Sequence, residues 1–194
     1  MTARHSSSPA PARYATTDTP IGPFTVLVDG DVVLASGWTA DIGDLVPVVH
    51  RTLRPADIEA ADRLAVLDVV DAFHAGDVAA IDDVAVSQRS GPFLTEAWEV
   101  LRTVPAGHPD SYAEFAARCG RPSAVRAAAG ACARNAAALF VPCHRVLATG
   151  GGLGGFRWGT PVKRWLLDHE AAHAVPDTPA APARARDLVA VPVP

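Results

Sequence analysis

The sequence contains little lysine, little cysteine and no long hydrophobic run. No apolar stretch approaches the ~20 residues that a membrane-spanning helix needs, and the opening residues 1–6 lead into no apolar segment of the signal-peptide type. We therefore expect a cytoplasmic protein without a membrane partner. Its 194 residues, 49% of them hydrophobic, are enough for one or two compact cores.

The three cysteines argue against a disulfide-stabilised or zinc-binding protein. Cys119, Cys132 and Cys143 are odd in number and lie 13 and 11 positions apart, which fits neither a disulfide framework nor a Cys-x-x-Cys metal site. Free thiols in a reducing compartment are the simpler interpretation. The run Gly150–Gly152 lacks the Gly-Lys-Ser/Thr ending of a nucleotide-binding loop. We expect no metal and no cofactor.

The net charge of −4 at first disfavours a nucleic-acid partner, because phosphate binding is mostly electrostatic. The charge is, however, distributed unevenly along the chain. Residues 115–167 contain eight basic side chains and no Asp or Glu. The eight are Arg118, Arg121, Arg126, Arg134, Arg145, Arg157, Lys163 and Arg164. A basic half on an acidic protein is typical of a local DNA-facing surface, although arginines that merely solvate helix faces would give the same pattern.

The first half of the chain predicts a small α/β domain over residues 13–88. The segments 24–28 and 32–38 are strand-like, and Asp29-Gly30 between them favours a hairpin. Apolar residues recur at helical spacing from Ala56 to Phe73, so a helix should pack on this sheet.

The second half predicts helices. Ser111, with Glu114 three residues later, indicates a capping box, and Gly120-Arg121-Pro122 between two short segments indicates a helix-turn-helix. The helical segments that we expect are 93–104, one that begins at 111, one near 122–131, and 161–173, with a glycine-rich loop or wing at 150–159.

The flanking segments differ in composition from these elements. Residues 1–12 predict a disordered leader, residues 77–91 a polar linker, and the Ala- and Pro-rich residues 174–194 a flexible tail. The second domain is therefore expected to span residues 89–173.

The run Pro142-Cys143-His144-Arg145-Val146 carries the most chemical information in the chain. It follows the apolar segment 138–141, which indicates a buried strand or bend. A free cysteine has a pKa near ~8.5, and an adjacent base such as His144 increases its reactivity. A cysteine in an apolar setting is otherwise an ordinary small core residue.

This run resembles the signature of the O6-alkylguanine-DNA alkyltransferases, the methylated-DNA-protein-cysteine methyltransferases. Other residues match that family at fixed distances from Cys143, and the resemblance covers most of the chain. They are Tyr112, Arg126 and Asn135 before the cysteine and Lys163 and Glu170 after it. The resemblance implies a ribonuclease-H-like amino-terminal domain with a largely structural role, followed by a mainly α winged-helix domain that contains a helix-turn-helix.

The resemblance also implies a division of chemical roles. Cys143 would accept the alkyl group permanently, His144 would take the thiol proton through a bridging water, and Glu170 would orient that imidazole. Asn135 would tie the cysteine turn to the helix-turn-helix by hydrogen bonds. The alternatives are that Glu170 is a surface acid of the last helix and that Asn135 is only a helix C-cap.

Two further residues are expected to act on the guanine. Tyr112 would donate to guanine N3 and help the nucleotide to rotate out, and Lys163, the single lysine, would lie near this tyrosine and reduce the energy of developing negative charge. An ordinary aromatic at a helix start and a solvent-facing lysine are the alternatives. Val146, Phe156 and Arg157 would form the base pocket, with backbone contacts from Val146 and Arg157.

The DNA-contacting residues follow from the same resemblance. Arg126 would enter the base stack and fill the gap left by the flipped nucleotide. Ala127 belongs to an alanine-rich helix that can approach the minor groove closely, although packing on a neighbouring helix explains the alanines equally well. Arg145 is also expected to contact DNA.

The function predicted from the sequence is direct-reversal repair of O6-alkylguanine in double-stranded DNA by a single-turnover monomer. A non-catalytic winged-helix protein that binds lesions or regulates transcription is the alternative, and a cysteine hydrolase is a third reading. The chain departs from the common family pattern at Ala106, Ala129, Ala136 and Phe156. None of these departures removes an indispensable chemical group.

Overall fold

The computed structural model describes residues 10–174 of the chain. The leader predicted over residues 1–12 lies mostly outside the described residues, and β1 (Ala12–Thr19) already begins at its last position. The tail predicted over residues 174–194 lies outside them from residue 175 onward. Within residues 10–174, no helix is long and apolar enough to cross a membrane.

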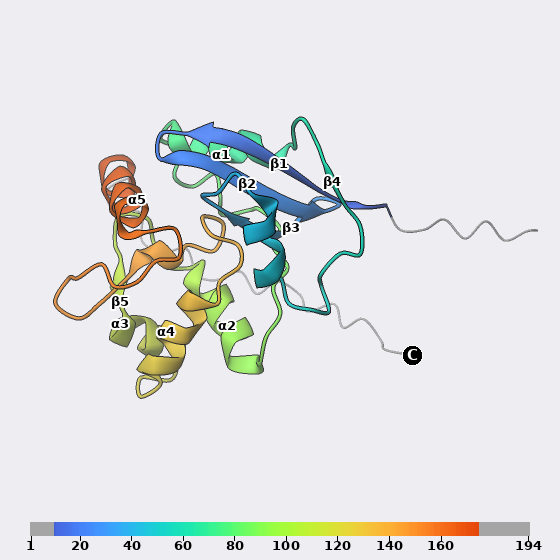
Figure 1. Cartoon of the computed structure of the whole chain (residues 1–194). Helices are drawn as coiled ribbons and strands as arrows, with labels where there is room; N and C mark the ends of the chain where they lie inside the picture. The colour runs from blue at the N-terminus through green and yellow to red at the C-terminus, as the bar shows by residue number, and fades with distance from the viewer. Residues whose placement is uncertain (1–9, 175–194) are drawn as a thin grey trace, which may run out of the picture.

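A four-stranded mixed sheet forms the first part of the fold (Figure 1). β1 pairs antiparallel with β2 (Gly22–Asp29), and β2 pairs antiparallel with β3 (Val32–Gly37). The hairpin predicted at Asp29-Gly30 is confirmed. Gly30 adopts a φ of +58°, a left-handed conformation that glycine adopts without strain.

The helix predicted from Ala56 to Phe73 is only half correct. α1 spans Val66–His74 and buries Leu67, Val70 and Phe73, but Ile58–Ala60 forms strand β4, parallel to β1. The free edge of β1 explains the difference, because its backbone groups need partners. Ala12 N donates to the Asp57 carbonyl at 3.1 Å, and Ala61 N donates to the Tyr14 carbonyl at 2.8 Å.

The second part of the fold is helical, as predicted. It contains α2 (Pro92–Leu101), α3 (Tyr112–Arg118), α4 (Val125–Ala133) and α5 (Thr160–His173). The capping box at Ser111 is confirmed, since its Oγ accepts from Glu114 N and its backbone N donates to the Glu114 carboxylate. Figure 1 shows α2, α3 and α4 in the lower part of the molecule, with the sheet and α1 above them.

The remaining connections contain little regular structure. The 3-10 helices η1 (Ile42–Asp44) and η2 (Val46–Val48) follow β3, and β5 (Asp110–Ser111) pairs in parallel with β6 (Val146–Leu147). The glycine-rich segment 150–159 is a loop without a strand.

One buried core joins the sheet to the helices and to the turn that carries the cysteine. Phe24, Val26 and Val28 from β2 share this core with residues of α1, α2 and α4, and with Phe140. Leu27 points to the opposite face of the sheet, where it packs in a smaller cluster with residues of the η1–η2 segment. The helical part therefore packs directly on the sheet rather than being connected only through a linker.

Candidate active site

The turn that precedes Cys143 (residues 136–141), called the cysteine turn below, is fixed to the edge of β3. Ser36 N donates to the Ala136 carbonyl at 2.9 Å, Ala138 N donates to the Ser36 carbonyl at 3.2 Å, and Ser36 Oγ donates to the Ala138 carbonyl at 2.7 Å. Leu139 is fully buried with a φ of +74°, a left-handed conformation that costs a branched residue about 1–2 kcal/mol. Of the two alternatives predicted for residues 138–141, the buried bend is confirmed.

Asn135 connects the end of α4 to the nucleophile. Its Nδ2 donates to the Val141 carbonyl at 2.7 Å and to Cys143 Sγ at 3.2 Å, while its Oδ1 accepts from Ala137 N at 3.1 Å. The side chain is 5% exposed, and the C-cap of α4 is Arg134 rather than Asn135. The predicted hydrogen bonds to the cysteine turn are therefore present, and the simple capping role is wrong.

His144, Arg145 and Glu170 form a buried cluster directly beside the cysteine. His144 Nε2 lies 2.9 Å from Glu170 Oε1, and Arg145 contacts both carboxylate oxygens through Nε at 3.0 and 3.1 Å. Arg145 Nη2 adds a contact at 2.8 Å, and its Nη1 donates to the Val104 carbonyl at 2.8 Å. The alternative of Glu170 as a surface acid is wrong, because the residue is fully buried.

The expectation that Arg145 contacts DNA is wrong. Its side chain is 3% exposed, and Glu170 and the Val104 carbonyl occupy its guanidinium. The sequence shows an arginine beside the nucleophile but not that a buried carboxylate 25 positions away requires a permanent cation. Arg145 therefore belongs to the internal electrostatics of the site.

The cluster fixes the charge of its members. Burial opposes ionisation of Glu170, but the hydrogen bond with His144 and the ion pair with Arg145 outweigh burial and lower its pKa to about 2. Burial lowers the pKa of His144 despite the attraction of Glu170, so its imidazole is neutral. Because Arg145 already neutralises Glu170, the His144 Nε2–H donates to the carboxylate. The other ring nitrogen, Nδ1, is buried and has no hydrogen-bond partner within residues 10–174.

The thiol of Cys143 is protonated at rest. Burial raises its pKa, while the hydrogen bond from Asn135 and the charges of Lys163 and Arg157 act in the opposite direction. The thiolate that a nucleophilic step requires is therefore formed by transfer of a proton to a base.

Lys163 and Tyr112 are both close enough to Cys143 to interact with it electrostatically. Lys163 is fully buried, its Nζ donates to the Val146 carbonyl at 2.6 Å, and burial lowers its pKa. The solvent-facing alternative for this lysine is wrong. Tyr112 begins α3 and is partly buried, which raises its pKa. A Cβ at Gly154 would lie 3.2 Å from the Tyr112 hydroxyl, so the glycine loop closes on this phenol.

A cavity of about 340 Å³ brings five predicted residues together, namely Tyr112, Asn135, Cys143, Phe156 and Arg157. Its other lining residues were not predicted as site residues, and most are small. They are Ala129, Cys132, Ala133, Ala138, Gly155 and Trp158. Small and aromatic side chains around one thiol give a slot suited to a planar base.

Other predicted residues lie outside this cavity. Arg126 and Ala127 are exposed on α4, and Val146 is buried behind the cavity, where its carbonyl holds Lys163. Within residues 10–174, no group of three or more His, Cys, Asp or Glu side chains is arranged to hold a metal ion.

Two supporting residues were not predicted as part of the site. Gln88 Nε2 donates to Asn135 Oδ1 at 3.1 Å, and its Oε1 accepts from Ala136 N at 2.7 Å. Trp158 stands against β3, since a Cβ at Gly37 would lie 1.9 Å from its indole ring. Nothing in the sequence distinguishes Gln88 from any solvated residue of a polar linker. Nor does the sequence around Trp158 indicate that its ring lines the cavity.

Comparison with known proteins gives consistent relationships. Residues 92–172 match the family model described as the DNA binding domain of 6-O-methylguanine DNA methyltransferase. A methylated-DNA–protein-cysteine methyltransferase of Mycobacterium tuberculosis is 34% identical over 164 residues, which are 84% of this chain and 95% of that protein. The protein of the same name from Salmonella typhimurium is 34% identical over 156 residues, covering 78% and 91%.

Solved structures give the same relationship. The crystal structure of the Mycobacterium tuberculosis protein OGT in complex with DNA has a TM-score of 0.69 and 32% identity, covering 84% of this chain and 94% of that one. The Mycobacterium tuberculosis O6-methylguanine methyltransferase has a TM-score of 0.68 and 32% identity, covering 86% and 96%. The mixed sheet and the helical part are thus similar to those of solved proteins across nearly their whole length.

Proposed function

This chain belongs to the methylated-DNA–protein-cysteine methyltransferase family, and we propose that it repairs O6-alkylguanine in double-stranded DNA by moving the alkyl group irreversibly onto Cys143. The observation that carries the proposal is the cavity in which Cys143, Asn135 and Tyr112 meet beside the His144–Glu170 pair. A module that only binds lesions has no need of a thiol next to a buried imidazole and carboxylate.

The proposed step balances without a cofactor. The S–C bond to Cys143 forms as the bond between guanine O6 and the alkyl carbon breaks, the thiol proton leaves through His144, and the guanine takes up one proton. Glu170 holds the Nε2 side of the imidazole, so Nδ1 is the nitrogen that would accept the proton through a bridging water. The resulting thioether is stable, which makes each molecule a single-turnover reagent.

Tyr112 and Lys163 are proposed to stabilise the departing guanine. The raised pKa of Tyr112 keeps the phenol protonated and able to donate to guanine N3. Lys163 brings a positive charge close to the cavity, where it favours the negative charge that develops on the base. We place the guanine edge against the backbone of Arg157, beside the Phe156 ring, because both residues line the cavity, whereas the predicted contact from Val146 would require this buried residue to become accessible.

The target atom lies inside the base stack, so the nucleotide must be flipped at a cost of a few kcal/mol. Arg126 is exposed on α4, and we propose that its guanidinium fills the gap in the stack. The exposed Ala127 beside it lets the helix approach the minor groove. A related protein from Mycobacterium tuberculosis was solved in complex with DNA, which supports a DNA partner here.

We propose that the finer architecture follows the same family. Residues 13–88 would form a ribonuclease-H-like domain with a structural role, and residues 89–173 a winged-helix domain. Within the second domain, α3 and α4 would be the helix-turn-helix and the loop around residues 150–159 the wing. Gly120 between the two helices has a φ of +70°, which supports a tight turn. We also propose a monomer in the cytoplasm, where the three free thiols meet reducing conditions.

Titration of methylated duplex against the protein tests this proposal. We expect one O6-methylguanine to be restored per protein molecule and no further turnover, while Cys143→Ala protein binds the duplex without repairing it. Binding without repair by the native protein would support the lesion-binding alternative. A burst of product from a thioester substrate with continued turnover would support the hydrolase.

A further inference from the structure

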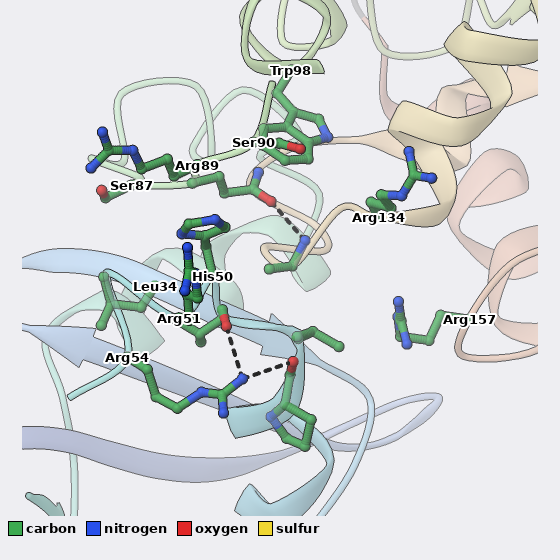
Figure 2. Close-up of a pocket in the computed structure, with 15 residues that line it drawn as sticks. Leu34, His50, Arg51, Arg54, Ser87, Arg89, Ser90, Trp98, Arg134 and Arg157 are labelled. Carbon is green, nitrogen blue, oxygen red and sulfur yellow. Dashed lines mark hydrogen bonds between the residues drawn. The ribbon is translucent and has the colours of Figure 1, made fainter. Parts of the chain in front are cut away.

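A second cavity, of about 400 Å³, lies beside the candidate active site and is rich in arginine (Figure 2). It is formed by the loop 47–54, the segment 87–90, and residues near the end of α4 and in the glycine-rich loop. Five arginines and no Asp or Glu line it. The five are Arg51, Arg54, Arg89, Arg134 and Arg157.

These guanidinium groups have no negative partner in the described part of the chain. Arg54 donates to the Pro47 and Val49 carbonyls, both at 3.2 Å, and Arg157 donates to the Ala133 carbonyl at 3.0 Å. None of the five forms an ion pair with a carboxylate of residues 10–174. The protein has 21 acidic residues, so this separation of charge leaves a cavity that attracts anions.

We call this arginine-rich cavity the arginine cavity, and the cavity of about 340 Å³ around Cys143 the alkyl-transfer cavity. The two cavities border each other. Arg157 lines both cavities. Arg134, which lines the arginine cavity, lies in the sequence between Ala133 and Asn135, which line the alkyl-transfer cavity. Figure 2 shows Arg134 and Arg157 on the right of the cavity, with Arg51, Arg54 and Arg89 on its left. Gln88 lines the arginine cavity and donates a hydrogen bond to Asn135, which lines the alkyl-transfer cavity, so this side chain connects the two cavities.

We propose that the arginine cavity binds the phosphodiester backbone of the DNA strand that leaves the active site. This inference rests on the proposed function and extends the DNA contact from α4 onto the loop 47–54 of the amino-terminal half. Guanidinium groups bind phosphate oxygens in bidentate fashion, and the Ser87 and Ser90 hydroxyls provide further donors. The amino-terminal half then takes part in substrate binding as well as in folding.

Salt-dependent binding of Arg51→Gln, Arg89→Gln and the double variant tests the proposal. Neither arginine has a hydrogen bond within residues 10–174 that would be lost, and both are exposed. Each phosphate contact contributes about 0.9 to the slope of log K against log salt, so the double variant should lose about 1–2 from the slope on a long methylated duplex. Arg13→Gln removes an exposed charge from β1 and is the matched control.

Duplex length and a free anion distinguish the possible sources of phosphate. A duplex that ends at the lesion should bind the native protein and the double variant equally well, and pyrophosphate should weaken binding of the long duplex to the native protein alone. A slope in the double variant equal to that of the native protein and of Arg13→Gln would overturn the proposal. Binding of pyrophosphate to the native protein, combined with a salt slope of DNA binding that is unchanged in the double variant, would overturn the proposal as well. That result would identify a site for small anions.

Methyl transfer to Cys143 from the short duplex is measured in the same proteins. Normal transfer with an unchanged salt slope removes the arginine cavity from the DNA interface and leaves the proposed function standing. Loss of transfer in the native protein would instead remove the proposed function itself.

Discussion

The side-chain amide of Asn135 donates to Cys143 Sγ at 3.2 Å and to the Val141 carbonyl at 2.7 Å. A donor at the sulfur stabilises the thiolate relative to the thiol, so Asn135 opposes the burial that raises the pKa of Cys143. The same amide also fixes the bend that presents the thiol to the cavity. Nucleophile position and nucleophile ionisation thus depend on one side chain.

Asn135→Ala should therefore raise the pKa of Cys143 further and slow methyl transfer. A hydrogen bond to a charged group is worth about 1.5–3 kcal/mol, which corresponds to a loss of about 10- to 100-fold in rate. The pH dependence of iodoacetamide alkylation, followed on the peptide that contains Cys143, measures the change. Cys119→Ser, outside the cavity, is the control and should leave the rate unchanged. An unaltered thiol titration in Asn135→Ala would contradict the account.

Arg145→Met should destabilise the protein by about 3–5 kcal/mol, because it leaves the buried Glu170 carboxylate without its principal cation. Arg126→Gln should not change stability, since that side chain is exposed, but should weaken binding to methylated duplex. Urea unfolding and a binding titration on both variants separate the two roles. Equal stability of the two variants would mean that Arg145 is not the structural partner of Glu170.

The stability of the protein should fall in acid. The pKa of Glu170 is lowered from an ordinary value of 4.5 to about 2, so its contribution is complete above about pH 4.5 and is lost as pH falls toward 2. The size of that contribution is about 3 kcal/mol. The lowered pKa of His144 acts in the same direction below its ordinary value of 6.5.

Thermal unfolding across this range should show a smaller loss of stability in Glu170→Gln than in the native protein. Glu99→Gln, an exposed position on α2, should keep the native pH dependence. An identical acid loss in all three proteins would contradict the buried ion pair as its source.

Gly37→Ala should disturb the active site from the amino-terminal half. A Cβ at this position on β3 would lie 1.9 Å from the Trp158 ring, which lines the alkyl-transfer cavity. Overpacking of this kind costs about 1–3 kcal/mol, and displacement of the indole should also slow methyl transfer. Gly91→Ala, which meets no atom within 4 Å, is the matched control. Normal transfer by a fully folded Gly37→Ala protein would show that Trp158 does not shape the cavity.

The sequence predicts best those site residues whose chemistry is local or whose spacing is characteristic. Cys143, Asn135 and Tyr112 meet at one cavity, and His144 and Glu170 pair beside it, as the resemblance to the alkyltransferase family implies. The predicted DNA contact of Arg145 is wrong because sequence shows charge but not burial. Gln88 was missed because its partners, Asn135 and Ala136, lie about 47 positions away and only the folded chain brings them together.

The same limit applies to the fold. The hairpin at Asp29-Gly30 and the capping box at Ser111 depend on neighbouring residues, and both are confirmed. The sequence predicts a helix at residues 58–60 because Ile58 continues the helical spacing of α1, whereas these residues form β4. The edge of β1 decides their structure instead, through backbone hydrogen bonds that no local pattern reports.

Mass analysis of the protein after stoichiometric incubation with O6-methylguanine duplex tests the central claim most directly. The peptide that contains Cys143 should gain the mass of one CH2 group, with the peptides of Cys119 and Cys132 unchanged. A folded protein that binds the duplex and leaves the Cys143 peptide at its original mass, or carries the methyl group on another cysteine, would contradict the account.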